Sequence, residues 1–204
     1  MTIEPKAFLL LHGYRNHRPP GHWQHWLAGE LSALGHAVDY PQLPDPDRPD
    51  PERWLAELRD RPVLPWRERV VVCHSLGCLL WLRAAAVPHC PPADRLLLVA
   101  PPSPGVLAGI PEIAAFAAPR PLPALPPSTR LVLGEGDPYG LGGAEWLGPL
   151  DTDLVPAGAH LNPDSGYGRW PAVLDWCLDP AVRITARPDP SPARRPAGTF
   201  HHAG

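Results

Sequence analysis

The pentapeptide Cys73-His74-Ser75-Leu76-Gly77 places a serine between an apolar run and a helical pattern. A strand that turns abruptly into a helix presents one side chain at the edge of a sheet, where the Ser75 hydroxyl could attack an electrophilic carbon. So tight a turn needs small residues two positions before and two positions after the serine. Gly77 meets this need, whereas Cys73 stands where the usual pattern has glycine. The segment therefore predicts a nucleophile elbow with one departure.

A serine hydroxyl reacts at neutral pH only if a histidine takes its proton and an acid orients that histidine. Where the serine sits on such an elbow, the acid and then the histidine follow it along the chain. Among the later histidines, His89 comes too soon for an acid to precede it at a strand end, and His201 and His202 lie in the last residues. His160 directly follows a predicted strand. We therefore predict His160 as the base for Ser75.

Asp137 is the predicted acid because it follows an apolar run at the carboxyl end of a predicted strand. Glu135 is its nearest competitor. The other candidates lie on the wrong side of a strand or come after the base, and they are Asp151, Asp153 and Asp164. Each partner also has an ordinary structural interpretation, with Asp137 as a turn residue before Pro138 and His160 as a cap for a carbonyl. Their order at successive strand ends favours catalysis.

An acyl-transfer site also needs hydrogen-bond donors for the negative oxygen of its tetrahedral intermediate. We predict the backbone N–H groups of Tyr14 and Leu76, because one follows the first predicted strand and the other begins the helix after the serine. Gly13 would let the backbone turn in close. We expect Gly13, Trp23 and His74 to line the substrate pocket.

Short apolar runs alternate with longer helical patterns along the chain. The expected strands are 6–12, 37–40, 70–73, 96–100, 130–134 and 153–156, and the expected helices are 23–34, 51–59, 76–86 and 170–178. Several of the strands are continuously apolar, as in a parallel sheet that is covered on both faces. The alternation predicts a doubly wound α/β fold of about six mostly parallel strands, with helices on both faces and right-handed crossovers.

Length and composition favour one domain, which we place at residues 1–180 of the 204. Residues 101–128 are rich in proline and alanine, with a short helix expected around 111–116. This segment could cover a pocket or merely cross the surface, and the sequence leaves both open. Residues 181–204 lack periodicity and are predicted to form a disordered tail.

The net charge of −3 gives no basic footprint for nucleic acid, and no apolar stretch is long enough to span a membrane or serve as a signal peptide. Four cysteines without paired spacing favour reduced thiols and a cytoplasmic location. His22 and His25 are close in sequence, but no third ligand joins them, so neither a metal nor a cofactor is expected. The expected partner is a small ester or amide, and nothing identifies a protein partner.

Several motifs together resemble the α/β-hydrolase fold, and more narrowly the small serine hydrolases related to retinoblastoma-binding protein nine. They are L-L-H-G-Y at 10–14, H-W-Q-H-W at 22–26, P-Q-L-P-D-P-D at 41–47, H-S-L-G-C at 74–78, D-P-Y at 137–139 and A-H-L-N at 159–162. The resemblance implies a hydrolase without a large cap domain, strand order 2-1-3-4-5-6 and a triad of Ser75, Asp137 and His160. The departures from its pattern are Cys73 and Ala159, each in place of glycine.

These observations lead to two hypotheses of different classes. The first is a serine hydrolase of the carboxylesterase type that cleaves a small carboxylic ester, or an activated amide or thioester, through an acyl-enzyme on Ser75. The alternative is a hydrolase scaffold that has lost catalysis and acts as a protein-binding module, because a fold does not by itself fix a function. The acyl chain and the leaving group are not encoded in any motif.

Overall fold

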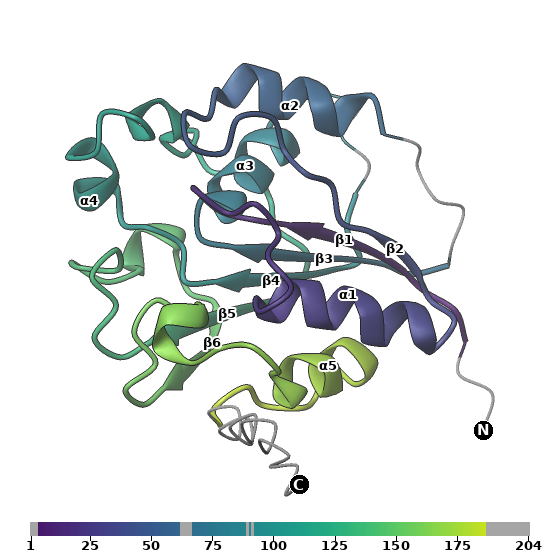
Figure 1. The fold of residues 1–204 in the computed structure, drawn as a ribbon. Helices are drawn as coiled ribbons and strands as arrows, with labels where there is room; N and C mark the ends of the chain where they lie inside the picture. Colours follow the sequence, from purple (N-terminus) through teal and green to yellow (C-terminus); the bar gives the residue numbers. More distant parts are fainter. Residues whose placement is uncertain (1–3, 62–66, 89, 91, 187–204) are drawn as a thin grey trace, which may run out of the picture.

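The computed structural model describes residues 4–61, 67–88, 90 and 92–186. At its centre lies a six-stranded sheet with the order β2-β1-β3-β4-β5-β6, in which every neighbouring pair is parallel (Figure 1). The strands are β1 (Ala7–Leu11), β2 (Ala37–Asp39), β3 (Arg69–His74), β4 (Arg95–Val99), β5 (Ser128–Gly134) and β6 (Asp151–Val155). The predicted fold class and strand order are confirmed.

Helices follow most of the strands, as the alternating pattern predicts. They are α1 (Trp23–Ala33), α2 (Pro51–Arg59), α3 (Leu76–Ala85), α4 (Pro104–Ala108) and α5 (Pro171–Leu178), with 3-10 turns η1 (Ala114–Phe116), η2 (Glu145–Leu147) and η3 (Pro163–Ser165). Helix α2 shows why the sequence starts a helix where it does. Asp50 accepts a hydrogen bond from the Arg53 N–H, and Pro51 occupies the first helical position, where no N–H is needed.

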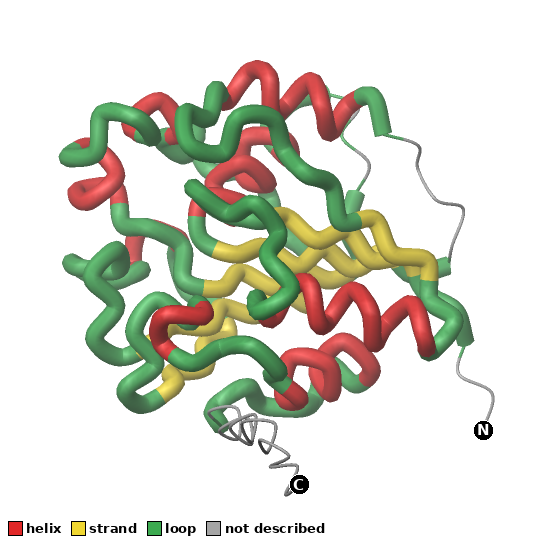
Figure 2. The backbone as a smooth tube through the Cα atoms, viewed as in Figure 1, coloured by secondary structure: helices red, strands yellow, loops and turns green. Residues whose placement is uncertain are grey.

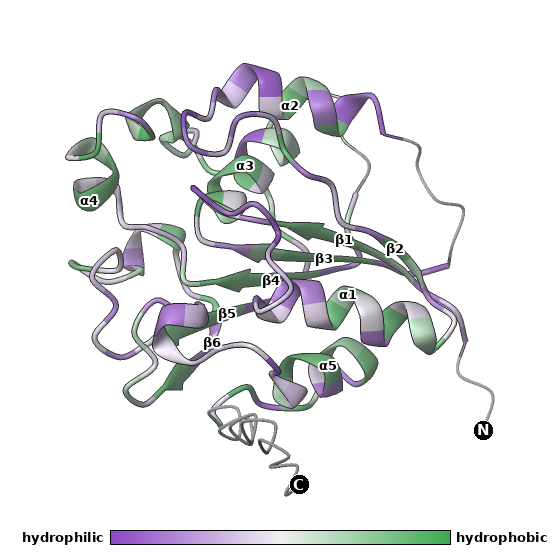
Figure 3. Cartoon of the chain, viewed as in Figure 1, coloured by the Kyte–Doolittle hydropathy of each residue, from purple (hydrophilic) through white to green (hydrophobic). Residues whose placement is uncertain are grey.

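Two apolar clusters cover the two faces of the sheet, with α2 and α3 on one side and α1 and α5 on the other (Figure 1). Alternate residues of each strand contribute to opposite clusters: Leu9 and Leu11 pack with α3, whereas Phe8 and Leu10 pack with α1. Figure 3 shows the central strands as the most uniformly apolar elements. Burial on both faces explains why these strands read as continuous apolar runs.

The proline-rich segment after β4 contains more helix than expected. Helix α4 begins at Pro104 after Ser103, whose hydroxyl accepts a hydrogen bond from the Val106 N–H. The short helix expected around 111–116 is the 3-10 turn η1, limited to three residues. Proline at the first position of a helix favours the start of that helix and does not interrupt it, which our prediction overlooked at Pro104.

The packed chain extends beyond residue 180. Ile184 is fully buried, and the Arg183 guanidinium lies 2.7 Å from the Asp151 carboxylate and 2.6 Å from that of Asp153. Residues 181–186 therefore pack on β6, in contrast to the tail that we expected to begin at 181. The remainder of that predicted tail, 187–204, lies outside the described residues.

The carboxyl ends of the strands meet at one edge, where the connecting loops gather (Figure 2). In a parallel sheet with helices on both faces, such an edge is where ligands bind. Among the described residues, no helix has the length and apolar character that crossing a membrane requires. The fold thus directs attention to the loops after β1, β3, β5 and β6.

Candidate active site

Ser75 occupies the turn between β3 and α3 with the backbone angles φ 53° and ψ −123°. This left-handed region is costly for a residue with a side chain, so the surrounding structure must enforce it. The Ser75 N–H donates to the Val99 carbonyl at 2.8 Å, which ties the turn to β4. A Cβ on Gly77 would lie 2.4 Å from the Leu11 carbonyl oxygen. Glycine there allows α3 to pack directly against the end of β1.

Cys73, the departure from the small-residue pattern, is a residue of the hydrophobic core. Its side chain is fully buried in the cluster between the sheet and helices α2 and α3. Burial raises the pKa of its thiol well above the ordinary value, so the thiol stays protonated. The backbone contact that demands glycine is made by Gly77, and Cys73 behaves as a small core residue.

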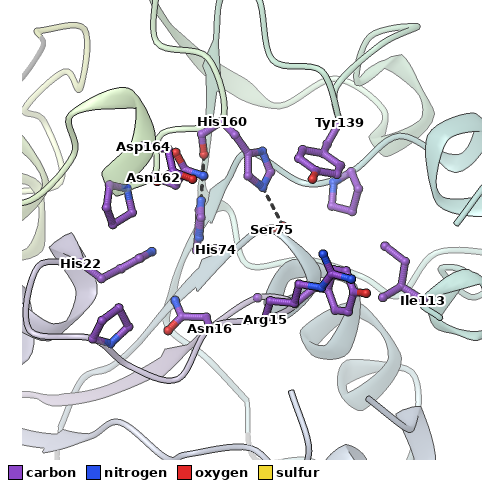
Figure 4. A pocket seen from close by; sticks show the side chains of 15 residues that line it. Arg15, Asn16, His22, His74, Ser75, Ile113, Tyr139, His160, Asn162 and Asp164 are labelled. Carbon is purple, nitrogen blue, oxygen red and sulfur yellow. Dashed lines mark hydrogen bonds between the residues drawn. The ribbon is translucent and has the colours of Figure 1, made fainter. Parts of the chain in front are cut away.

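The three predicted catalytic side chains form one hydrogen-bonded chain, of which Figure 4 shows the bond between Ser75 and His160. His160 Nδ1 lies 3.0 Å from both carboxylate oxygens of Asp137. Because a carboxylate only accepts, Nδ1 carries the hydrogen and Nε2 is left to accept from the Ser75 hydroxyl at 2.9 Å. The Tyr139 N–H donates to Asp137 Oδ1 at 2.9 Å and fixes the acid in turn. This arrangement can activate a hydroxyl as a nucleophile.

The loop from β6 to His160 is held by close backbone contacts. A Cβ on Gly134 would lie 2.0 Å from the Ala159 carbonyl oxygen, and one on Gly158 would lie 2.9 Å from the Gly134 Cα. Ala157, Ala159 and Leu161 all adopt positive φ, between 46° and 51°. We call this segment, residues 156–161, the base loop.

Two aromatic side chains donate hydrogen bonds to base-loop carbonyls. His74 Nε2 donates to the His160 carbonyl at 3.0 Å, and Trp23 Nε1 donates to the Leu161 carbonyl at 3.0 Å. Burial, together with the neighbouring His160 and His22, holds the pKa of His74 well below its ordinary value, so its ring is neutral. Both donors lie beneath the base and support its backbone.

His22 forms a row of three imidazole rings with His74 and His160. The ring centroids of His22 and His74 are 5.2 Å apart, and those of His74 and His160 are 5.1 Å apart. His22 Nδ1 accepts from the Gln24 N–H and caps α1. Burial lowers the pKa of His22 to about 3. Its neutral ring therefore carries its hydrogen on Nε2, which has no partner among the described residues.

The two predicted oxyanion donors lie near the nucleophile with their N–H groups unengaged by any described residue. A Cβ on Gly13 would lie 2.8 Å from the Ser75 Cβ, so glycine lets this backbone approach the serine. The Gly13 carbonyl accepts from His12 Nδ1 at 2.9 Å. Because C=O and N–H point oppositely across a trans peptide, this bond sets the direction of the Tyr14 N–H. Leu76 begins α3, where an N–H lacks a helical acceptor.

His12 is a supporting residue that our sequence analysis missed. Its Nε2 accepts from the Leu43 N–H at 2.9 Å, which leaves the hydrogen on Nδ1 for the Gly13 carbonyl. Burial lowers the pKa of His12 to about 4 and keeps this tautomer neutral. The H-G pair after a buried strand is a signal for such a role, but we used it only to place the turn.

A cavity of about 460 Å³ opens over Ser75, and Gly13 and His74, which we expected to line the pocket, lie in its walls together with Tyr14 and His160. Trp23 does not line it, contrary to our expectation. It is fully buried between the sheet and α5, where its indole packs edge-on against Trp170. The neighbouring His22 takes its place at the wall. Pro102 and Ile113 also line the cavity, so the 101–128 segment borders it.

Glu135 and Asp153, two of the competing acidic residues, have other partners. Glu135 accepts from the Ala157 N–H at 3.0 Å and thus holds the base loop. Asp153 is fully buried and pairs with Arg130 at 2.7 Å. Asp164 lines the cavity, although it comes after the base in the chain. Within the described ranges no group of three or more histidine, cysteine or acidic side chains is placed to hold a metal ion, and His89 lies outside those ranges.

Comparison with known proteins extends this picture. No curated protein matches the sequence significantly. Among solved structures, the ydeN gene product of B. subtilis aligns with a TM-score of 0.63 and 21% identity, over 86% of this chain and 98% of that one. A putative YdeN-like hydrolase from Pectobacterium atrosepticum aligns with a TM-score of 0.64 and 22% identity, over 85% and 89%. Alpha/beta hydrolase domain-containing protein 10 from mouse gives 0.53 and 18%, over 76% and 81%.

At these identities the structural likeness shows a shared α/β-hydrolase fold. The sequence likeness goes further, because a family model described as serine hydrolase matches residues 8–178, which include Ser75, Asp137 and His160. The chain therefore belongs to the serine hydrolase family.

Proposed function

We propose that this hydrolase cleaves small carboxylic esters, or the related activated amides and thioesters, through an acyl-enzyme on Ser75. The observation that carries the proposal is the 2.9 Å contact between Ser75 Oγ and His160 Nε2, with Asp137 on the opposite ring nitrogen. All four cysteines are free thiols, and three of them are buried, which supports our proposal of a cytoplasmic location.

In the proposed reaction, Ser75 Oγ attacks the ester carbonyl carbon while His160 Nε2 takes the hydroxyl proton. The carbonyl oxygen gains the negative charge and accepts from the Tyr14 and Leu76 N–H groups. The carbon–oxygen bond to the alcohol then breaks, and His160 returns the proton to the departing oxygen. Water attacks the acyl-enzyme by the same route and releases the acid and Ser75.

A fluorophosphonate probe tests the nucleophile. We expect it to label the native protein and the Ser32→Ala variant, whose exposed serine bonds only to its own helix, but not Ser75→Ala. The rate of hydrolysis of p-nitrophenyl acetate should fall by roughly a thousandfold or more in Ser75→Ala and His160→Gln. Labelling that persists without Ser75 would contradict the proposal.

The same assay addresses the alternative of a protein-binding module. Its motivation is the pair of departures at Cys73 and Ala159 together with the proline-rich surface, yet neither departure removes a reacting group. A folded protein that is neither labelled nor able to hydrolyse any short ester would favour the binding module.

A further inference from the structure

A second cavity of about 230 Å³ lies beside the active site and is lined almost entirely by apolar side chains. It lies between α3, α4, η1 and η2, and its walls include Leu79, Leu107 and Trp146 together with Ala114 and Ala118. Leu79 stands one helical turn after Ser75 on α3, so the cavity begins close to the nucleophile. We call it the Leu79 cavity.

The Leu79 cavity and the cavity over Ser75 adjoin. Pro102 lines both of them, and the consecutive residues Ile113 and Ala114 each line one. Figure 4 shows Ile113 and His22 on opposite sides of Ser75. An elongated substrate that reacts at Ser75 could therefore extend past Ile113 into apolar surroundings.

The opposite side of Ser75 is polar. Asn16, His22 and Asp164 line it, and Asn162 and Asp164 come from the chain directly after His160 (Figure 4). In acyl transfer the leaving oxygen must receive its proton from His160 Nε2, so the leaving group lies on the histidine side. The acyl group, bonded to Ser75 Oγ, then extends away from that side.

We propose, on the basis of the function proposed above, that the acyl part of the substrate is an unbranched aliphatic chain that lies in the Leu79 cavity. The alcohol part is polar and lies among Asn16, His22 and Asp164. Apolar walls select for chain length, because each methylene buried contributes a nearly constant free energy. That contribution corresponds to about a fourfold rise in kcat/KM per methylene.

The first test uses the native protein and p-nitrophenyl esters of acetate, butyrate, hexanoate and octanoate. We expect kcat/KM to rise along the series until the cavity is full. Two esters that carry the long chain on opposite sides of the ester bond test whether the Leu79 cavity holds the acyl part or the alcohol part. Ethyl octanoate should be hydrolysed with a higher kcat/KM than octyl acetate. Hydrolysis of acetate without a rise along the series, or a preference for octyl acetate, would overturn the inference while leaving the proposed function intact. Absence of both hydrolysis and probe labelling would instead overturn the proposed function.

The second test narrows the cavity. Ala114→Leu should lower the ratio of octanoate to acetate kcat/KM by at least about tenfold. Ala115→Leu is its matched control, because Ala115 is the exposed neighbour in the same turn and does not line the cavity. If Ala114→Leu does not fold, Ala118→Leu makes the same test from a cavity-lining position just after the turn. Equal ratios in the narrowed and control variants would overturn the inference.

Discussion

The elbow and the base loop hold the two reacting side chains by different means. At the elbow one residue, Ser75, has positive φ, and backbone contacts with the neighbouring strands hold the turn, from the Ser75 N–H to Val99 in β4 and from Gly77 to Leu11 in β1. In the base loop, three residues with side chains have positive φ, and the supports come from distant parts of the chain, including Trp23 and His74. The nucleophile is thus held by backbone contacts within the sheet, whereas the base also depends on hydrogen bonds from the side chains of Trp23 and His74. We expect damage at the elbow to lower stability first and damage at the base loop to lower turnover.

The largest expected effect is at the elbow. Gly77→Ala would place a methyl against the carbonyl of Leu11 in β1, which cannot move without displacing the sheet. We expect the free energy of unfolding in urea to fall by about 3 kcal/mol. Gly29→Ala is the control, because Gly29 is an exposed residue of α1 with open space around it. The free energy of unfolding of this variant should rise by about 0.5–1 kcal/mol. Equal stabilities of the two variants would contradict a rigid elbow.

The next effect is the pH dependence of the free energy of unfolding. It compares one buried histidine near the elbow with one beside the base loop. The folded-state pKa values of His12, near the elbow, and His22, beside the base loop, are lowered from 6.5 to about 4 and about 3. Below about pH 6.5 these two histidines therefore bind a proton in the unfolded chain but stay neutral in the folded chain. The free energy of unfolding consequently falls as the pH falls below about 6.5. The loss should be about 1.4 kcal/mol per pH unit for each histidine.

Urea unfolding of His12→Asn and His22→Asn between pH 6.5 and 5 measures these contributions. Each variant should lose about 1.4 kcal/mol per pH unit of the native slope. Asparagine at position 22 retains a cap for α1, so a general loss of the helix is avoided. If the free energy of unfolding depends on pH in both variants as it does in the native protein, neither ring is buried in the neutral form.

A smaller effect isolates the base loop. Trp23→Phe removes the donor to the Leu161 carbonyl and leaves that oxygen buried without a partner, at a cost of about 1–2 kcal/mol. Because the loop carries His160, kcat for p-nitrophenyl acetate should fall by about tenfold. Trp26→Phe is the matched control, since its indole N–H has no partner in the described part of the chain. Equal kcat values in the two variants would show that the base does not depend on this support.

The smallest effect tests the strain in the base loop. Ala159→Gly places glycine at φ 46°, where a side chain is disfavoured, and should raise the free energy of unfolding by up to about 1 kcal/mol. The same exchange at exposed Ala33, in the last turn of α1, should lower it by about 1 kcal/mol. If both exchanges lower stability equally, position 159 carries no strain.

The sequence predicted the central features because they depend on local patterns. All six strands were expected from short β-type runs, several of them continuously apolar. The elbow motif, positions at strand ends and chain order together selected the three side chains that lie within hydrogen-bond distance of one another. Features that depend on distant packing were missed. Trp23 resembles a pocket residue by its proximity to Tyr14 in the chain, but its indole turns toward the Leu161 carbonyl in the core. The H-G pair marked the turn at His12, but nothing in it identified Leu43, the partner of His12, which lies on a separate loop.

The replacement of glycine by Cys73 gives the protein an internal reporter. A fully buried, protonated thiol directly behind the nucleophile reacts with alkylating reagents only after the chain around it opens. Modification at this position therefore records the opening of the chain around β3 in the intact protein. Thiol reagents that leave hydrolysis untouched would show that the sheet is closed during turnover, and the rate at which they finally act would measure how often it opens.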